Sequence, residues 1–397
     1  MNQRGIILPI TLMFLLILTT LSMSLLTVGG HETQIAANHT RGLHAQFLAE
    51  AGLEDAFNRF RNDTTLLLTA SSSLTTLSGL SGPGSTLSAY GGYDVQYQSS
   101  GLNTVRVVVT GYTGTSGSQT ATRVLRAVLT IGFNNSDAVR TNDDLKISGN
   151  PIITGTCGSV HTNDDLTISG NPTVTGAATA HDDYSVSGNP VVGVGSGGDK
   201  ATKTVPTISA STFLTQAKAT VTASQIYQFF SDGKVRDGND TLITTLGNND
   251  TYRGWKFKSS DAKWEYNDNT AYDGTYYFQG EVKISGSPGT LLTPWNVTII
   301  ATGDITVSGS PHFNVHSLDT LFVSEDDVDI SGSFTMYESG AIIAGDEIEI
   351  SGSPTIIGYI LGGNDDDNKI SGSPTITYNC GLAPPVTADL TIVAAGF

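Results

Sequence analysis

One seven-residue phrase occurs eight times in this 397-residue chain and constrains its fold more than any other feature. It reads LKISGNP from residue 145 and returns as LTISGNP, YSVSGNP, VKISGSP, ITVSGSP, VDISGSF, IEISGSP and NKISGSP. Ile or Val precedes its Ser-Gly pair at positions 147, 168, 186, 284, 307, 330, 350 and 370. Within the group of three and the group of five the spacing is about 20 residues, which is typical of stacked architectures.

Each phrase has the pattern expected of one corner of a coil. Alternating apolar residues precede Ser-Gly and another apolar position follows the Pro, so every repeat offers two short strands with inward side chains. Gly permits the backbone angles of the corner, and Pro suits the start of the next strand. We therefore predict a right-handed parallel β-solenoid of about eight coils. A β-sandwich of repeated hairpins fits the even period poorly.

The first 62 residues predict one long helix with two different halves. The apolar run 6–28 follows Arg4 and is long enough, at about 1.5 Å per residue, to cross a bilayer. The positive-inside rule keeps the N-terminus in the cytoplasm. Leu53, Phe57 and Phe60 follow at helical spacing, which predicts that the helix continues to residue 62 with one face against protein.

This N-terminus resembles that of the type IV prepilins. The leader MNQRG, the apolar helix and the segment ETQIAANHTRGLHAQFLAEAGLEDA are similar to the PilX-type minor pilins and, more distantly, to the K pseudopilin of type II secretion. The resemblance implies that prepilin peptidase cuts between Gly5 and Ile6 and methylates Ile6. It also implies that other pilins bind the helix, and that the chain moves from the inner membrane into an extracellular pilus.

One position departs from the resemblance. Major pilins carry a glutamate at the fifth position after the cut, where this chain has Ile10. In that family the glutamate pairs with the N-terminus of a neighbouring subunit, because an unpaired carboxylate in lipid is costly. The K-type pseudopilins of the filament tip also lack it. We therefore expect this subunit at or near the tip, the alternative being a loss without positional meaning.

Strand patterns and repeats divide the rest of the chain. Alternating segments between 91 and 133 predict three antiparallel strands of a small pilin-like head, so the N-terminal module has an α+β fold. The expected parts are a leader 1–5, a helix 6–62 with a transmembrane part 6–28, a head 63–135, coils 1–3 in 136–194, an insertion 195–278, and coils 4–8 with the C-terminal end in 279–397. The insertion holds a helical stretch and many aromatic residues. We expect it to cover a flank or end of the solenoid, the alternative being a glycan-stacking surface.

Two cysteines occupy equivalent places in the first and last repeats. Cys157 and Cys380 each stand six residues after the Pro of their phrase. Coils stacked in chain order would hold them far apart. If the insertion carries the chain back, so that the last coil stacks on the first, they come within disulfide distance. Two unpaired thiols are the alternative.

Acidic pairs precede most of the phrases, and stacking would align them. The pairs considered for calcium are Asp143 with Asp144, Asp164 with Asp165, and Asp326 with Asp327. Like charges about 5 Å apart repel, and Ca²⁺, a hard cation that takes oxygen ligands, would relieve the repulsion. The spacing matches no EF-hand loop, and solvated turns are the alternative. Calcium is the one cofactor considered; no other is expected.

These features together predict a binding and assembly protein rather than an enzyme. A net charge of -17 argues against nucleic acid as a partner. Acids recur in coil after coil, so no catalytic pair is singled out. We predict a minor pilin of a type IV pilus that acts in assembly and adhesion, with a tip adhesin or a surface glycan as outer partner. The alternatives are a pseudopilin of a type II secretion system and an anchored polysaccharide-processing enzyme.

Overall fold

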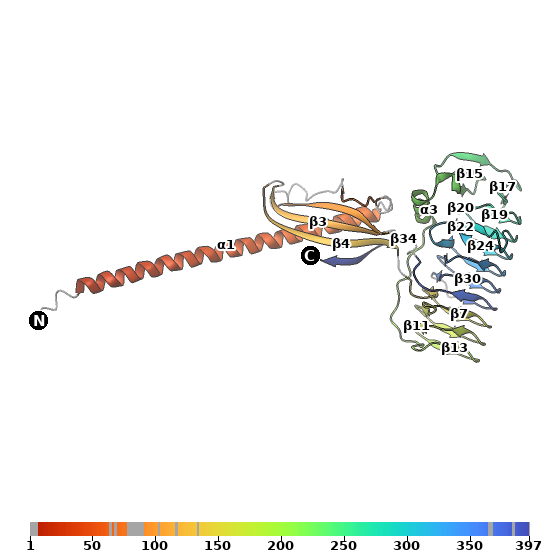
Figure 1. Ribbon diagram of the computed structural model, residues 1–397, viewed down its shortest axis with the longest axis horizontal. Helices are drawn as coiled ribbons and strands as arrows, with labels where there is room; N and C mark the ends of the chain where they lie inside the picture. Colours follow the sequence, from red (N-terminus) through yellow and green to blue (C-terminus); the bar gives the residue numbers. More distant parts are fainter. Residues whose placement is uncertain are drawn as a thin grey trace.

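The computed structural model joins a long helix, a small sheet and a β-solenoid. It describes residues 7–62, 66, 70–77, 91–101, 104–115, 118–132, 135–363, 368–382 and 386–396. In Figure 1 the helix extends away from the sheet toward the N-terminus, and the solenoid lies at the opposite end of the molecule with its stack across the helix direction. This is the predicted fold class, with differences in the number of coils and in the path of the chain.

Helix α1 runs over Ile7–Asn62 without interruption. Its apolar first half is uncovered within the chain, and it is the one helix of the described residues long and apolar enough to cross a membrane. Its second half packs on the sheet through a face that includes Ala45, Ala49 and Phe60, which are fully buried. At Gly111 the packing is so close that a Cβ would collide with the helix backbone, so this position accepts only glycine.

The small sheet is antiparallel and has five strands in the order β1-β2-β3-β4-β34. The predicted strands appear as β2 (Gly92–Gly101), β3 (Thr104–Thr115) and β4 (Ser118–Gly132), with a short β1 (Thr75–Thr76) at one edge. The other edge is β34 (Val386–Gly396), from the far end of the chain. The expectation that the C-terminal end stays with the solenoid is therefore wrong. The solenoid is inserted between two neighbouring strands of the head.

The phrase-bearing strands form one face of the solenoid. They are β6 (Leu145–Ile147), β9 (Leu166–Ile168), β12 (Tyr184–Val186), β21 (Val282–Ile284), β23 (Ile305–Val307), β26 (Val328–Ile330), β29 (Ile348–Ile350) and β32 (Asn368–Ile370). They pair in parallel, and in most of them the first and third residues are buried while the middle one faces outward. The predicted inward and outward alternation is therefore confirmed on this face.

Each coil has three strands, whereas the sequence predicted two. The strands after the Pro are β7 (Ile152–Thr154), β10 (Thr173–Val174), β13 (Val191–Val192), β24 (His312–Val315), β27 (Thr335–Met336), β30 (Thr355–Ile357) and β33 (Thr375–Thr377). The third strands are β5 (Val139–Thr141), β8 (Val160–Thr162), β11 (Ala178–Ala180), β22 (Trp295–Ala301), β25 (Thr320–Ser324), β28 (Ala341–Ile343) and β31 (Ile360–Gly362). Most of the third strands are buried on both faces, so they lack the alternation by which a strand is recognised.

The chain stacks its last repeat on its first. Strand β32 pairs with β6, β33 with β7, and β31 with β5, all in parallel. The five late coils therefore continue the stack of the three early ones. Cys157 and Cys380 form a disulfide across this junction, with their Cα atoms 5.4 Å apart. The sequence places these two cysteines in contact only if the last coil stacks on the first, and the structure has this stacking order.

The insertion adds turns to one end of the stack, so the solenoid has more coils than the eight phrases. Its helix α3 (Ala210–Thr220) precedes β14 (Ile226–Phe229), β15 (Lys234–Asp237), β16 (Leu242–Thr245), β17 (Thr251–Tyr252), β18 (Trp255–Lys258), β19 (Lys263–Tyr266) and β20 (Gly274–Phe278). Strand β19 pairs with β21, and β20 with β22. Trp255, Trp264 and Tyr276 are fully buried in a cluster of edge-on and tilted rings. These aromatic residues close the end of the core, and the alternative of a glycan-stacking surface is wrong for them.

A buried polar network joins the start of the solenoid to the segment that returns from coil 3. Asp137 accepts hydrogen bonds from the Arg140 guanidinium at 2.6 Å and from Lys203 Nζ at 2.8 Å. The Arg140 side chain also donates to the Thr204 carbonyl oxygen. His161 is fully buried beside this network, and burial, together with the Lys203 charge, lowers its pKa to about 4. The junction thus encloses a histidine as well as the ion pairs of Asp137.

Replacing Cys157 and Cys380 together by Ala should lower the free energy of unfolding of the solenoid. The disulfide closes a loop of 223 residues, and the chain-entropy estimate for such a loop is about 5 kcal/mol. Urea denaturation of the detergent-solubilised chain, followed by tryptophan fluorescence, measures the change. Ser333→Ala, at an exposed corner, is the control. An unchanged unfolding midpoint for the double variant would contradict the prediction.

Candidate functional site

The acidic pairs lie along one edge of the solenoid, and the second acid of a pair often links neighbouring coils. The Asp144 carboxylate accepts a hydrogen bond from the backbone N–H of Asp165 at 3.1 Å, and the Asp165 carboxylate accepts one from Asp183 at 2.8 Å. Asp327 accepts the same bond from the Glu347 N–H at 2.9 Å. These second acids therefore have a structural role, because they satisfy backbone donors at the turns.

The predicted metal residues gather in two separate places. Among the early coils, one carboxylate oxygen each of Asp143, Asp144 and Asp164 lies within 4.8 Å of the other two, and so do those of Asp164, Asp165 and Asp182. Among the late coils, Asp326 and Asp327 meet Asp304 at the same spacing. Asp304 was not among the predicted residues because it is a lone acid, although it stands directly before the ITVSGSP phrase. Asp365, Asp366 and Asp367, before the last phrase, lie outside the described residues.

Crowding raises the pKa of acids in both clusters. The pKa of Asp164 rises to about 6 because the carboxyl group is partly desolvated and because Asp144, Asp143 and Asp165 surround it with negative charge. The pKa of Asp326 is also raised, first by burial and then by Asp304 and its other acidic neighbours. Each cluster thus carries an electrostatic cost at neutral pH that a proton or a cation would relieve.

The outer face beside the late cluster is acidic as well. A shallow cavity of about 230 Å³ is lined there by Asp304, Thr306, Asp327, Val328, Asp329, Glu347 and Glu349. Burial and the charge of Glu349 raise the pKa of Asp329. Lys369 Nζ lies 2.8 Å from Glu349 and offsets part of the charge on the next coil. The ligands offered are oxygen atoms, which suits a hard divalent cation better than a soft one. Calcium binding stays a prediction.

The residues of the expected processing and assembly sites are close together at the N-terminus of the chain. Gly5 and Ile6 lie outside the described residues. Ile10 is described, and its side chain is 53% exposed within the apolar half of the helix. The neighbouring side chains of that half are apolar and uncovered too, and this surface has no partner inside the chain. Burial of such a surface in lipid or against other helices is strongly favourable.

Comparison with known proteins identifies the N-terminal part of the chain. Residues 4–54 match the family model described as PilX N-terminal. No curated protein and no solved structure matches the chain. The resemblance to PilX-type pilins, read from the leader and the helix, is therefore confirmed, and here that N-terminus is joined to a β-solenoid. The match supports a minor pilin of a type IV pilus, anchored in the membrane by its apolar helix.

Asp164→Asn should stabilise the fold at neutral pH in the presence of a chelator. An acid whose pKa is higher in the folded state, here about 6 against about 3.9 in the unfolded chain, binds its proton more tightly when folded. Wild-type stability should therefore rise as the pH falls from 7 to 4, and the variant should lose part of this rise. Thermal unfolding at several pH values measures it, with the exposed Asp261→Asn as control. Identical pH profiles for wild type and Asp164→Asn would refute the prediction.

Calcium at millimolar concentration should raise the melting temperature of the wild-type chain. A ligand at 100 times its Kd stabilises the folded state by about 2.7 kcal/mol. The double variant Asp143→Asn and Asp164→Asn removes two ligands of the early cluster and should lose part of the effect. Calorimetry with calcium and with magnesium measures the melting temperatures of the wild type and of the double variant. If calcium leaves the wild-type melting temperature unchanged, the acidic pairs are solvated turns.

Proposed function

Because residues 4–54 match the PilX N-terminal family, we propose that this protein is a minor pilin of a type IV pilus that displays its β-solenoid at or near the filament tip. In this proposal prepilin peptidase removes residues 1–5 and methylates Ile6. Before assembly the chain is anchored in the inner membrane as a single-pass protein, and it then enters the pilus. Its work is assembly and adhesion, not catalysis. The family match carries the proposal.

The uncovered half of α1 supports assembly with other pilins. The same apolar surface fits a bilayer before assembly and neighbouring helices after it, since both exclude water. The helix continues unbroken into the head, where close contacts such as the one at Gly111 fix its direction. The helix and the head therefore form one rigid unit that can transmit its position in a filament to the solenoid.

Two observations favour the tip over the shaft. Ile10 supplies no carboxylate to pair with the N-terminus of a neighbouring subunit, so one contact that a shaft position uses is lacking. The solenoid also lies across the end of the head (Figure 1), where it would collide with neighbours in a closely packed shaft. A subunit that begins or ends the filament has room for it on one side.

The two other functions differ in what they require of the solenoid. A type II secretion pseudopilin would use the same helix and head, with the solenoid in contact with a secreted substrate. An anchored polysaccharide-processing enzyme would need one pair of acids on opposite sides of a bound sugar chain. The described acids instead form clusters that recur along the stack, which favours binding over bond cleavage.

The proposal predicts that the solenoid is found at the ends of sheared pili. Immunogold labelling with an antibody against residues 280–380 measures the position, and mass spectrometry of the same pili checks for an N-methylated Ile6. A Gly5→Leu variant, which blocks the implied cut, should remain in the membrane fraction. A strain that lacks the chain controls the antibody. Label along the whole shaft would refute the tip position, and label confined to membranes in the wild type would refute the pilus.

A further inference from the structure

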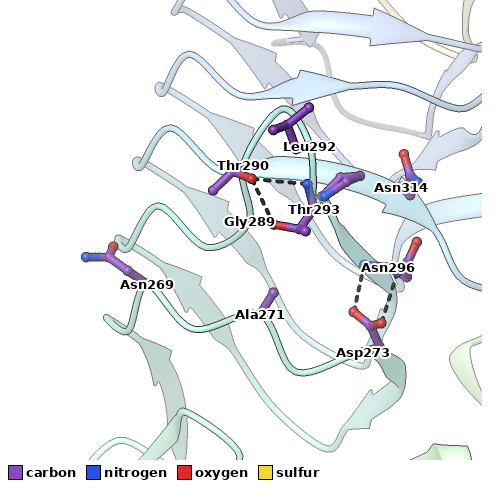
Figure 2. Close-up of a pocket in the computed structure, with 10 residues that line it drawn as sticks. Asn269, Ala271, Asp273, Gly289, Thr290, Leu292, Thr293, Asn296 and Asn314 are labelled. Carbon is purple, nitrogen blue, oxygen red and sulfur yellow. Dashed lines mark hydrogen bonds between the residues drawn. The ribbon is translucent and has the colours of Figure 1, made fainter.

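The two ends of the solenoid are finished differently (Figure 1). At one end the insertion adds the antiparallel pairs β14–β15 and β18–β19 and closes the core with the fully buried Trp255 and Trp264. Side chains also tie neighbouring turns there, since the Asp273 carboxylate accepts hydrogen bonds from the Asn296 N–H and Nδ2 (Figure 2). Coil 3 ends the stack on the opposite side, and its strand β12 is the last one of the phrase-bearing face.

Strand β12 has a neighbour on one side only. It pairs in parallel with β9, and no other strand of the described residues pairs with it. In β9, the N–H of Leu166 and the carbonyl oxygen of Ile168 bond to the backbone of coil 3. Tyr184 and Val186 stand at the same places one coil further. Their N–H and C=O groups therefore face the position that a next coil would occupy.

The apolar core is exposed at this edge. Ile147 and Ile168 are fully buried, whereas Val186, which occupies their place in coil 3, is 46% exposed. Val191 and Val194, which follow in the same coil, are more exposed still. Soluble proteins usually protect an open strand edge with charged residues, with a bulge or with a covering segment, because an unprotected edge pairs with another strand.

Neither charge nor the chain itself protects β12. Residues 184–198 contain no Asp, Glu, Lys, Arg or His, in a chain whose net charge is -17. The segment that returns from coil 3 covers a different side of the coil, where Gly197 forms a bridge with Thr179 of β11. The edge of β12 is thus apolar, uncharged and unpaired within the described chain, which suits it to pairing with a strand from outside.

The contact that this edge could complete already exists inside the chain. The last coil stacks on the first through β32 and β6, although 223 residues separate their cysteines. One coil can therefore dock on another without a direct connection. In a second copy of the chain the insertion closes the far end of the stack, so coil 3 of one copy would meet coil 3 of the other. Two identical surfaces meet in this way around a twofold axis, which makes the paired strands antiparallel.

Strand β12 is complementary to itself in that arrangement. With Ser185 opposite the same residue of the second copy, Tyr184 of each copy faces Val186 of the other, and each such pair exchanges its N–H···O=C bonds. The Asp183 carboxylates of the two copies are then four residues apart along the strands, or about 13 Å. Physiological salt largely screens repulsion over that distance. Neither hydrogen bonding nor charge therefore opposes the contact.

We propose that two copies of this chain associate end to end through coil 3, with their β12 strands paired antiparallel about Ser185. The contact would satisfy the outward N–H and C=O groups of Tyr184 and Val186 and remove the exposed part of Val186 from water. It joins two solenoids into one continuous stack. The proposal goes beyond the minor-pilin function, because it concerns the solenoid alone and does not depend on the filament that α1 enters.

Cysteine crosslinking of the full chain in detergent micelles tests the register. Cys157 and Cys380 are already joined, so Ser185→Cys provides a thiol with no partner in its own chain. Opposite residues of this kind have Cα atoms about 4.5 Å apart, which is within disulfide range. Mild oxidation should therefore convert most of the variant to a covalent dimer. Thr167→Cys, on the same face one coil away, is the matched control. Three strand spacings, about 14 Å, would separate its thiols, so it should stay monomeric.

Val186→Pro tests the hydrogen bonds across the edge. Proline is tolerated in an edge strand whose N–H faces solvent, but not between two paired strands. The variant should therefore fold as the wild type does and associate about tenfold more weakly or worse. Analytical ultracentrifugation of both chains in the same detergent measures this, and any association through α1 would be common to both.

Three results would overturn the proposal. They are equal association of the wild type and Val186→Pro, equal crosslinking of Ser185→Cys and Thr167→Cys, and a monomeric wild-type chain. The last result would leave a strand of another protein as the occupant of the edge. If Val186→Pro fails to fold, the two cysteine variants decide alone, because both substitutions lie at exposed positions.

Discussion

Hydrogen bonding between the last repeat and the first is the interaction on which the rest of the structure depends. Strands β32 and β33 pair with β6 and β7, so the chain leaves the solenoid beside the place where it entered. Seven coil spacings in simple chain order would instead place the exit roughly 34 Å away. Since entry and exit are close, β34 can return to pair with β4 and complete the head sheet. The disulfide between Cys157 and Cys380 secures the same junction.

This order of stacking requires a connection that runs from coil 3 back past the early coils. The connection covers one face of the solenoid there. Val205 and Ile208 of the returning segment pack on the core, and Arg140 bonds to Thr204 within it. Most of the third strands, which form the covered face, are buried throughout, whereas the phrase strands keep an outward residue. Covering also brings charged groups inside. Asp137 is therefore paired with both Arg140 and Lys203, because a lone buried charge would be too costly.

The parts of the fold that could be predicted are those with a period. The phrase strands and α1 can be recognised because their apolar residues recur every 2 and about 3.6 residues. The equivalent positions of Cys157 and Cys380 in two repeats likewise indicated that these residues could be in contact. The third strands have no alternation, because both of their faces are covered, and so they escaped prediction. Strand β34 pairs with a strand more than 250 residues earlier, and no local pattern encodes such a partner.

The two candidate sites differ in the same way. The acidic clusters follow from the repeat, since stacking aligns any acid that recurs before the phrase. The open edge of β12 does not follow from it. Its phrase, YSVSGNP, has the same pattern as the other seven. That β12 ends the stack comes from the pairing of β32 with β6 and of the insertion with β21, which only the folded chain displays.

The topology also determines how a load would travel through a filament. From the late coils the backbone enters the head at β34. A pull on the far end of the stack would therefore tend to peel coils one after another if β34 were the only attachment. The disulfide and the pairing of the last coil with the first provide a second attachment, through β5 to β4, so the load is shared between two neighbouring strands of the head. A head closed by both ends of its inserted domain is thus suited to resist a pull on the solenoid, which a solenoid attached at one end would do less well.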